Sequence, residues 1–439
     1  IYTLSLHDAL PIWGNFTEIA HKPTIMRKLI TQLLGVLIFA AGNLQAQNAP
    51  LTLEAVLSHI RQNHPLVKAA EAGIRAAEAE KMGLMVRFPS LPEADASMMR
   101  VGRSQLYNLT VGAMQTFELR NQAISRTEAG EANVALAKQQ MQLVLQERLS
   151  EARRAFVHAV YTQEKYVLLQ LLAREAAQLS EVIQQRHKAG HSTGFDATLA
   201  ALEANRTTIA VQQGQLQADQ ARQALTRLTY LEINPQQVFS LPSFPDTLLT
   251  EAHLIQKAWQ NRAELMVLAQ ERNVLSAKRL LADKNQTPNL QAGAFVAIDN
   301  TYLDRTIPVV GLRFVMPLPI RKPGWYNLGT AELLRLDSEL IANQFTYEAK
   351  KEQIRLEVIA AAAQLTLASR TYRLSQAMQE LLAETTTQIA QLYHEKRLDV
   401  TQYLAHQTRL ASVRLERLEW AYQVMLAYTE ANIACGLPD

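Results

Sequence analysis

The chain has 439 residues, a formal net charge of +3 and a single cysteine, Cys435. The nearly balanced charge, with both signs mixed, argues against nucleic acid as a partner, and one cysteine excludes intramolecular disulfides and a cysteine metal cluster. Charged residues make up only 19% of the chain, below the usual quarter, which fits a protein whose outer surface is not entirely in water.

The N-terminal segment has the composition of a targeting signal. Residues 1–25 show no coherent period, and we expect an upstream, non-native segment there, with a genuine N-terminal extension as the alternative. Residues 26–46 begin with Met-Arg-Lys, continue with an apolar run of about a dozen residues and end at Ala46. That run is shorter than the roughly 20 residues that span a bilayer. It predicts a secretory signal peptide with cleavage after Ala46.

The remaining chain consists of two internal repeats, at residues 51–234 and 250–437, with a proline-marked linker at 235–249. Each unit opens with a short apolar segment and an alanine-rich or apolar helix. The two parts of the opening are joined by Asn63-His64-Pro65 in the first unit and by Asn261-Arg262-Ala263 in the second. Because a proline-marked break and a long helical region follow each opening, we expect the same plan of elements in both units.

Apolar residues alternate with other residues in two short stretches of each unit, the pattern of a β-strand. The alternation is clearest in the second unit, at Leu290, Ala292, Ala294, Val296 and Ile298, and then at Val310, Leu312, Phe314 and Met316. It is weaker in the first unit, at Ala94, Ala96 and Met98, and then at Leu109, Val111 and Ala113. A polar turn at about 300–305 joins the second pair, so each unit is expected to contribute one strand hairpin.

Two long regions lack helix breakers. No proline lies in 93–234, and neither proline nor glycine lies in 330–435, so helices far longer than the usual three or four turns are expected. Apolar residues recur every seven positions, which predicts coiled-coil packing, at Leu333, Leu340, Tyr347, Ile354 and Ala361. Each region is broken once, at 186–196 and at 393–402, which predicts a helical hairpin in each unit.

Four strands cannot close into a barrel, and open sheet edges in lipid would leave unpaired backbone groups. Bacterial outer-membrane barrels have even strand numbers from 8 upward, and three chains of four strands would give twelve. The expected fold is therefore mainly α with a pair of β-hairpins, with long coiled-coil helical hairpins and four membrane strands in two internal repeats. It would close as a trimeric twelve-stranded barrel and an α-helical tunnel.

Such a pore is a conduit rather than a catalyst. The sequence has no glycine-rich phosphate loop, no nucleophile elbow and no paired carboxylates in a defined pocket. We therefore expect neither an enzyme nor a cofactor.

The order of these features, present twice, resembles the TolC-type outer-membrane efflux proteins over essentially all of 51–437. The resemblance rests on the two openings, the strand pairs, the stretch from Gly190 through Asp196 to Leu199-Ala200, and the ending Ala434-Cys435-Gly436-Leu437. It implies a homotrimer that crosses the outer membrane, in contact with its lipid, and carries a helical tunnel into the periplasm. It also implies two protein partners, a periplasmic adaptor (membrane fusion protein) and an inner-membrane resistance–nodulation–division pump.

A finer resemblance points to the heavy-metal subfamily, the outer-membrane partners of cobalt–zinc–cadmium and copper–silver pumps. After the second strand, four residues match that subfamily's pattern and three depart from its glycines; the matches are Gln115, Phe117, Glu118 and Leu119, and the departures are Arg120, Asn121 and Gln122. In the second unit the run 316–321 matches and Lys322-Pro323 departs. These motifs lie at strand-to-helix junctions, so they mark ancestry rather than ion selectivity.

Several functions share this shape. The subfamily resemblance implies export of heavy-metal cations, and a drug-efflux duct and a type I secretion duct are the alternatives within transport. A periplasmic coiled-coil scaffold without a pore is the alternative from another class. A scaffold accounts for the heptads but not for four alternating strands.

The family resemblance implies an inner gate at the hairpin tips, where acidic side chains ring the pore and salt bridges hold the tips shut. Asp196 lies at this position in the first unit, whereas Gln402 departs from the acidic pattern in the second. Asp399 would supply the charge there instead, with Arg397 or Arg186 as its partner. The alternative for Asp196 is that it caps the returning helix.

The same tips are where an adaptor would dock, through the candidate residues Gly190, Thr193, Gly194, Lys396 and Leu398. The two glycines permit close backbone approach, or form an ordinary turn.

Two further groups of residues have a composition that could form a site. His187 and His191 have a spacing that suits a metal, and His394 lies at the other tip, but Gly190 breaks the helix between the pair and solvent-exposed polar residues are favoured. No metal site is therefore expected. Three aromatic residues flank the strands and belong either to an interfacial belt or to ordinary loops: Tyr302, Trp325 and Tyr326.

Overall fold

The computed structural model describes residues 50–88, 90–100, 107–234, 237–240, 251–299, 307–317, 329–395 and 397–437. Several expectations fall outside these residues: the upstream segment and signal peptide, most of the linker, the turn at 300–305, Lys396, and the aromatic residues Tyr302, Trp325 and Tyr326. Among the described residues, none of the helices has an apolar stretch of the length that a bilayer requires.

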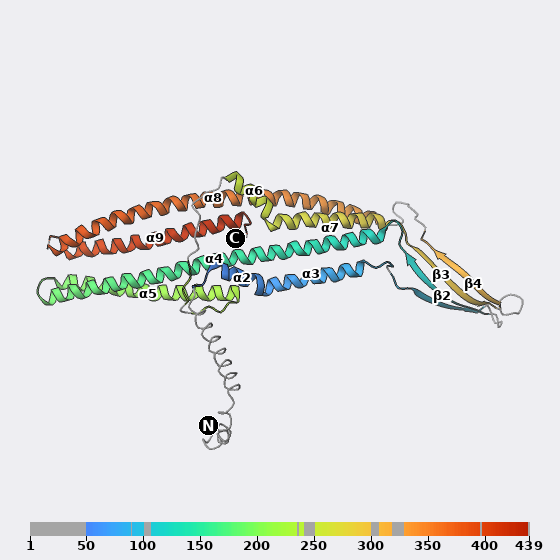
Figure 1. Ribbon diagram of the computed structural model, residues 1–439, viewed down its shortest axis with the longest axis horizontal. Coiled ribbons are helices and arrows are strands. Elements are labelled where there is room, and N and C mark those ends of the chain that lie inside the picture. Colours follow the sequence, from blue (N-terminus) through green and yellow to red (C-terminus); the bar gives the residue numbers. More distant parts are fainter. Residues whose placement is uncertain are drawn as a thin grey trace, which may run out of the picture.

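The molecule is elongated, with a four-stranded sheet at one end and the tips of two helical hairpins at the other (Figure 1). The first half of the chain forms α2 (Leu53–Asn63), α3 (Pro65–Leu84), β1 (Glu93–Arg100), β2 (Tyr107–Phe117), α4 (Gln122–Lys188) and α5 (Gly194–Thr229). The second half forms, in the same order, α6 (Glu251–Asn261), α7 (Ala263–Asn285), β3 (Leu290–Asp299), β4 (Ile307–Val315), α8 (Thr330–His394) and α9 (Val400–Ala434). The predicted plan of elements therefore occurs twice.

The long helices are as the missing prolines predict. Helix α4 has 67 residues and α8 has 65, so each is about 100 Å long at 1.5 Å per residue. The opening helices are separated sharply because Pro65 cannot continue α2 but suits the first position of α3, where no backbone donor is needed. His64 caps α3, since its Nδ1 accepts a hydrogen bond of 3.2 Å from the Leu66 amide.

The helices pack side by side in the order α5, α4, α9, α8 in the half of the molecule that carries the hairpin tips. The heptad prediction is confirmed in α8, where Ile354, Val358 and Ala361 are buried. Helices α5 and α8 form the two sides of this layer, and each packs mainly on its own hairpin partner.

Each repeat has its own apolar core midway along the molecule. In the first repeat Phe156 packs with Ile60 and Leu225; in the second, Ile354 packs at the centre of a corresponding cluster with Leu265. Burial of each such side chain is worth about 1.5–3 kcal/mol. A third cluster lies near the tips and contains Ile183, Ala200 and Leu404, so it joins the two hairpins.

The four strands form one antiparallel sheet in the order β1-β2-β3-β4. The hairpin of the first repeat is joined to that of the second by the pairing of β2 with β3, which runs from Asn108 opposite Asp299 to Phe117 opposite Leu290. Strands β1 and β4 each have one neighbouring strand among the described residues, so the sheet has two open edges.

Candidate functional site

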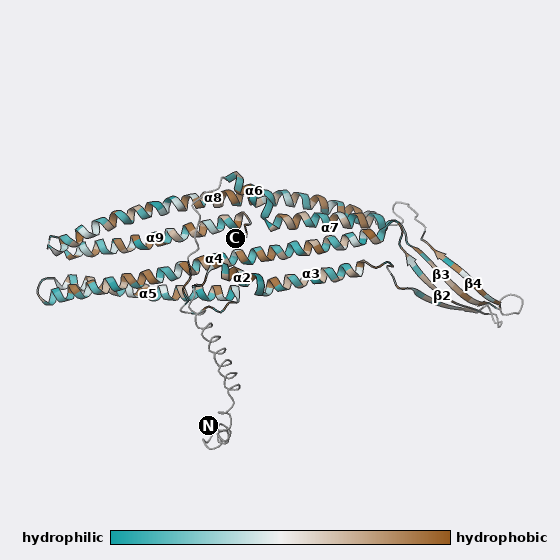
Figure 2. Cartoon of the chain, in the orientation of Figure 1, coloured by the Kyte–Doolittle hydropathy of each residue, from teal (hydrophilic) through white to brown (hydrophobic). Residues whose placement is uncertain are grey.

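The sheet is apolar on the face that is more exposed. The register aligns Ala96, Val111, Val296 and Val310 in one row, and this face also carries Met98, Ile298, Leu312 and Phe314. Val310 is 78% exposed and Leu312 72%. Figure 2 shows hydrophobic residues along the strands in alternation with hydrophilic ones.

The opposite face is the more polar one and is better covered. It carries Asp95, Thr110, Gln291, Asp299 and Arg313 beside the apolar residues Phe295, Ala297 and Val309, and Thr110 is buried. A sheet of a water-soluble protein buries its apolar face and exposes its polar one, so this sheet is inverted. A large exposed apolar patch marks contact with a membrane or with another protein.

The first hairpin tip is a tightly bonded turn. Gly190 takes a left-handed conformation with a φ of +75°, and the His191 amide donates back to the Arg186 carbonyl at 2.8 Å, which ends α4. Helix α5 then begins with a capping box in which the amide of Asp196 donates to Thr193 Oγ1 and the amide of Thr193 donates to Asp196 Oδ2, both at 3.1 Å.

Asp196 is therefore engaged within its own turn. Its side chain is buried and also accepts a hydrogen bond from the Ser192 hydroxyl at 3.1 Å. Burial raises the pKa of this carboxyl, but the hydrogen bonds from Thr193 and Ser192 outweigh it and hold the pKa below its usual value. The capping alternative for Asp196 is present in the structure, with Thr193 rather than Asp196 as the first capping residue. An acidic gate ring remains a prediction.

The second tip leaves its charges on the surface. Asp399 begins α9, and its exposed carboxylate accepts a hydrogen bond from the Val400 amide at 2.8 Å. Arg397 pairs with Glu395 at 3.6 Å, and Gln402 is exposed one turn into the helix.

The partner predicted for Asp399 is different in the structure. Arg397 pairs with Glu395 in the same turn. Arg186 lies over the ring of Tyr393, with its guanidinium carbon 4.6 Å from the ring centroid. A cation that stacks on an aromatic ring is already favourably placed. Within the described part of one chain, Arg397 and Arg186 thus have other partners, and the pairing of Asp399 at a gate stays a prediction for the assembled channel.

An arginine of the first tip contacts a pair of stacked aromatic rings in the second tip. Tyr393 stacks on Tyr403 with ring centroids 4.4 Å apart, and Arg186 reaches Tyr393 from the other hairpin. Of the docking candidates, Gly190 has open space around it, and Gly194 lies against the ring of His187. Leu398 is partly exposed, and Lys396 lies outside the described residues.

One histidine at the first tip is engaged in the turn. His187 Nδ1 lies 2.9 Å from the carbonyl oxygen of Ser192, so it is used in the turn. In the parts of the chain that the structure describes, no group of three or more potential metal ligands comes together.

The side chains of the strand-to-helix motif in the first repeat join neighbouring elements through hydrogen bonds and an ion pair. The Gln122 amide donates to the carbonyl oxygens of Lys284 at 3.0 Å and Thr287 at 2.9 Å, which ties α4 to the end of α7. Arg126 forms an ion pair with Glu118 and donates to the Leu84 carbonyl at 2.8 Å. These side chains are engaged in joining elements, as the position of the motif at a junction predicts.

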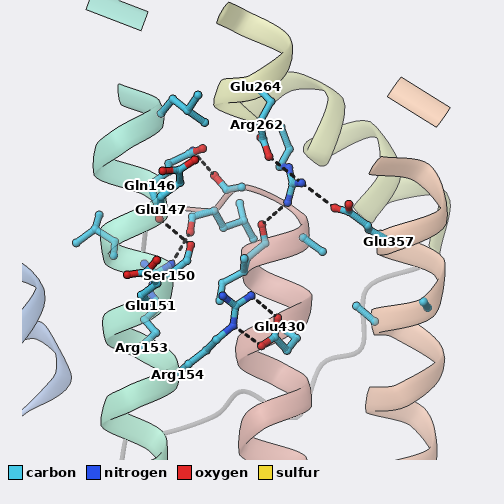
Figure 3. Close-up of a pocket in the computed structure, with 18 of the residues that line it drawn as sticks. Gln146, Glu147, Ser150, Glu151, Arg153, Arg154, Arg262, Glu264, Glu357 and Glu430 are labelled. Atoms are coloured by element: carbon cyan, nitrogen blue, oxygen red, sulfur yellow. Dashed lines mark hydrogen bonds and ion pairs between the residues drawn. The ribbon is translucent and has the colours of Figure 1, made fainter. Parts of the chain in front are cut away.

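Sequence reasoning missed a polar cavity of about 570 Å³ at the middle of the molecule, between α4, the start of α7, α8 and the end of α9 (Figure 3). Arg154 makes a two-pronged pair with Glu430 at 2.5 and 2.8 Å. Arg262 pairs with Glu357 at 2.7 Å and with Glu264 at 3.0 Å. Arg154 and Arg262 are thus each held by glutamates, and Arg153 donates to the Leu437 carbonyl at 3.2 Å.

The same cavity is a structural joint. The Gln146 amide donates to the Asn261 and Gly436 carbonyls and its oxygen accepts from the Ala263 amide. A Cβ at Gly436 would lie 2.9 Å from the Asn261 backbone, so the C-terminal turn and the elbow before α7 pack without a side chain between them. The repeat-marking motifs around Asn261 and Gly436 had drawn attention from the sequence, but nothing local predicts that they meet. Cys435 is buried beside this joint, and burial raises the pKa of its thiol.

The fold defined by these elements is that of the TolC-type outer-membrane channels, and the fold class predicted from the sequence is thereby confirmed. Among solved structures, the chain matches the channel-forming protein CusC with a TM-score of 0.72 at 15% identity, over 89% of this chain and 94% of that one. It matches the outer-membrane channel OprN with a TM-score of 0.70 at 16% identity, over 88% and 90% of the two chains.

A third match is the open state of the MtrE outer-membrane channel of Neisseria gonorrhoeae, with a TM-score of 0.67 at 14% identity, over 88% of this chain and 89% of that one. No protein-family model and no curated protein matches the sequence. At these identities the likeness establishes the fold.

Proposed function

We propose that the protein is the outer-membrane exit duct of a tripartite efflux pump, a passive trimeric channel rather than an enzyme. The observation that carries this proposal is the inverted sheet, whose apolar face is exposed at Met98, Val310, Leu312 and Phe314. Lipid on that face would remove the unfavourable contact with water and leave the polar face toward an aqueous lumen. The helices would then extend into the periplasm.

The two open sheet edges support a trimer. In lipid, β1 and β4 would each leave a row of backbone groups without partners. Pairing β4 of one chain with β1 of the next removes both edges, and three chains of four strands give the even number that such barrels require.

The helical layer offers a matching contact between chains. Helix α5 exposes apolar residues every seven positions, at Phe195, Leu202, Ile209 and Leu216. Helix α8, on the other side of the layer, does the same at Leu367, Leu374 and Leu381. A seven-residue apolar repeat is the pattern of a coiled-coil contact, so α5 of one chain would pack on α8 of its neighbour and close the tunnel. A scaffold in water would leave these stripes, and the apolar face of the sheet, uncovered.

The test is to isolate the protein from outer-membrane fractions, measure its mass in detergent and record its conductance in planar lipid bilayers. A trimer that migrates as such until heated, and that conducts ions, is the expected result. A soluble periplasmic monomer would overturn the proposal.

We further infer that the cargo is heavy-metal cations, with a periplasmic adaptor docked at the hairpin tips and an inner-membrane pump behind it. Support comes from the strand-end motif Gln115, Phe117, Glu118 and Leu119, which resembles the heavy-metal subfamily. Deletion of the gene should raise sensitivity to copper, zinc, cobalt or cadmium more than sensitivity to drugs. Sensitivity to drugs alone would favour a drug-efflux duct, and loss of a secreted protein would favour type I secretion.

A further inference from the structure

One ion pair spans the polar face of the sheet from edge to edge. Asp95 lies on β1 and Arg313 on β4, the two outer strands, yet Asp95 Oδ2 and Arg313 Nη1 are 2.9 Å apart. The arginine reaches across β3, where its guanidinium carbon lies 5.3 Å from the ring centroid of Phe295. A contact between the two edges of a four-stranded sheet needs a clear path over the strands between them.

Glycines clear that path. Asp95 is opposite Gly112 in the register, and Arg313 is opposite Gly293. A Cβ on Gly112 would lie 2.7 Å from Asp95 Oδ1, and a Cβ on Gly311 would lie 2.5 Å from the Phe295 ring. The carboxylate and the ring therefore lie flat on the backbone of the neighbouring strands, and any larger residue at either glycine would displace them.

The carboxylate depends on this one cation. Asp95 Oδ1 is shielded from solvent and has no hydrogen-bond partner among the described residues, while Oδ2 is held by Arg313. The pair as a whole stays in contact with solvent, since the side chains of Arg313 and Asp95 are 39% and 37% exposed, and removing either member leaves the charge of the other without its partner. Without Arg313, the charge of Asp95 would have to be balanced by an ion from solution.

The surrounding face is acidic. Among the described strand residues that share it, Glu93, Asp95 and Asp299 are acids and Arg313 is the base. This step rests on the proposed function, a trimeric barrel channel. In such a barrel this face lines the lumen, and the three chains place three copies of each charge at the same level along the pore axis. Rings of like charge in a narrow pore set its preference for cations or anions.

We propose that Asp95 and Arg313 are the ion-selectivity determinants of the barrel lumen. The pair neutralises one acidic ring, so that the pore passes anions as well as cations. The permeating species are small hydrated ions, and the balance of these two side chains contributes to the preference of the channel for cations or anions.

The experiment measures reversal potentials of reconstituted channels in a potassium chloride gradient. R313Q should raise the ratio of cation to anion permeability by roughly threefold or more, because three carboxylates lose their counter-ions. D95N should shift the ratio in the opposite direction, because three arginines are released. The double variant D95N/R313Q removes one charge of each sign and should return close to the wild-type ratio.

R335Q serves as a matched control, because Arg335 is exposed and pairs with Glu332 of α8 rather than with a residue of the sheet. Its permeability ratio should equal that of the wild type. If R313Q does not assemble as a trimer, D95N alone still predicts a shift toward anions, and R313K, which keeps the charge, predicts none.

Conducting channels in which both single variants keep the wild-type ratio would overturn the proposal and leave the pair as a brace of the sheet. A wild-type protein that does not conduct would instead count against the proposed function, so the two failures are distinguishable.

Discussion

In the first repeat, the acidic residue of the hairpin turn is hydrogen-bonded within the turn: Asp196 is buried and accepts hydrogen bonds from Thr193 and Ser192. In the second repeat, Asp399 caps its helix through Val400 while its carboxylate stays exposed, next to the exposed pair of Arg397 and Glu395. The same plan of helices therefore holds one tip by buried hydrogen bonds and leaves surface charge on the other. The two copies of one unit therefore differ in how their tips are held.

The elbows before α3 and α7 differ in the same way. His64 begins α3 as a neutral cap next to Pro65, whereas Arg262 precedes α7 with no side-chain cap and is tied instead to Glu264 and Glu357. The first elbow is held by a hydrogen bond between a side chain and a nearby backbone amide. The second is held by ion pairs within α7 and with α8. The predictions below test this division of labour, from the largest expected effect to the smallest.

The largest effect is expected where the two repeats of different chains would meet. Leu216 on α5 and Leu374 on α8 are 59% and 71% exposed in the single chain and lie at similar distances from their tips. L216K or L374E should abolish the trimer, since each places a charge in an apolar contact between chains. The measurement is molecular mass in detergent by light scattering, with helix content by circular dichroism.

The matched control is Q215E, because Gln215 is exposed on α5 but about 100° around the helix from Leu216. It should leave the trimer intact. The double variant L216K/L374E should recover part of the trimer if α5 and α8 face each other. Trimers that survive both single substitutions would show that these stripes are not the contact.

The elbow of the second repeat should be the more costly one to break. R262A removes the cation that holds Glu264 and Glu357 and should lower the free energy of unfolding by roughly 2–3 kcal/mol, since the arginine is largely buried but its partners are partly solvated. H64A removes one cap and should lower it by about 1 kcal/mol. Denaturant unfolding of the detergent-solubilised protein measures both, and equal losses would contradict the difference between the elbows.

These elbows and tips also show how far the sequence alone reaches. The strand alternation at Leu290 to Ile298, the long proline-free helices and the breaks at Gly190 and Asp399 are local patterns, and the structure has strands, helices and turns there. The pairing of Arg397 with Glu395 was not predicted, because it depends on how one turn is closed. Likewise, the meeting of Arg313 with Asp95 depends on the order of strands across the sheet, which no short stretch encodes.

The first elbow should respond to pH while the second should not. Burial, followed by the charge of Arg148, lowers the pKa of His64 below its usual 6.5, and its Nδ1 must be neutral to accept from the Leu66 amide. An unfolded chain then binds the proton more readily, so this contribution to stability is present above about pH 6.5 and is lost as the pH falls toward the folded pKa.

H64N keeps a capping acceptor without the titration, so its unfolding midpoint should fall less between pH 7 and pH 5 than that of the wild type. R262A should show the same pH dependence as the wild type, because His64 is unchanged in it. A wild-type midpoint that rises on acidification in this range would reverse the sign and exclude the assignment.

The two tips should separate stability from charge. D196A opens the capping box and leaves the Thr193 amide without its acceptor, so the free energy of unfolding should fall by about 1 kcal/mol. D399N keeps an acceptor for the Val400 amide and removes an exposed charge, so it should change stability by less than about 0.5 kcal/mol. If Asp399 lines the pore, D399N should also reduce the cation preference of the channel, whereas D196A should not.

The last comparison concerns the junctions between the sheet and the long helices. Arg120 and Asn121 precede α4 with φ angles of 55° and 58°, a left-handed conformation that asparagine tolerates and arginine does not favour, whereas Gly329 occupies the place of Asn121 before α8 with φ of 79°. R120G should raise the free energy of unfolding by about 0.5–1 kcal/mol, the relieved strain being partly offset by the greater freedom of glycine in the unfolded chain.

Loss of the Arg120 pair with Asp283 matters little to that balance, since both side chains are over 40% exposed and the distance is 3.4 Å. The matched variant in the other repeat is G329A, which has room for a methyl group but not the right backbone angle, so it should destabilise by about 1–2 kcal/mol. Opposite signs at the two junctions would establish that one repeat carries backbone strain that the other avoids with glycine. A destabilised R120G would instead mean that the side chain of Arg120 contributes more than its strained backbone removes.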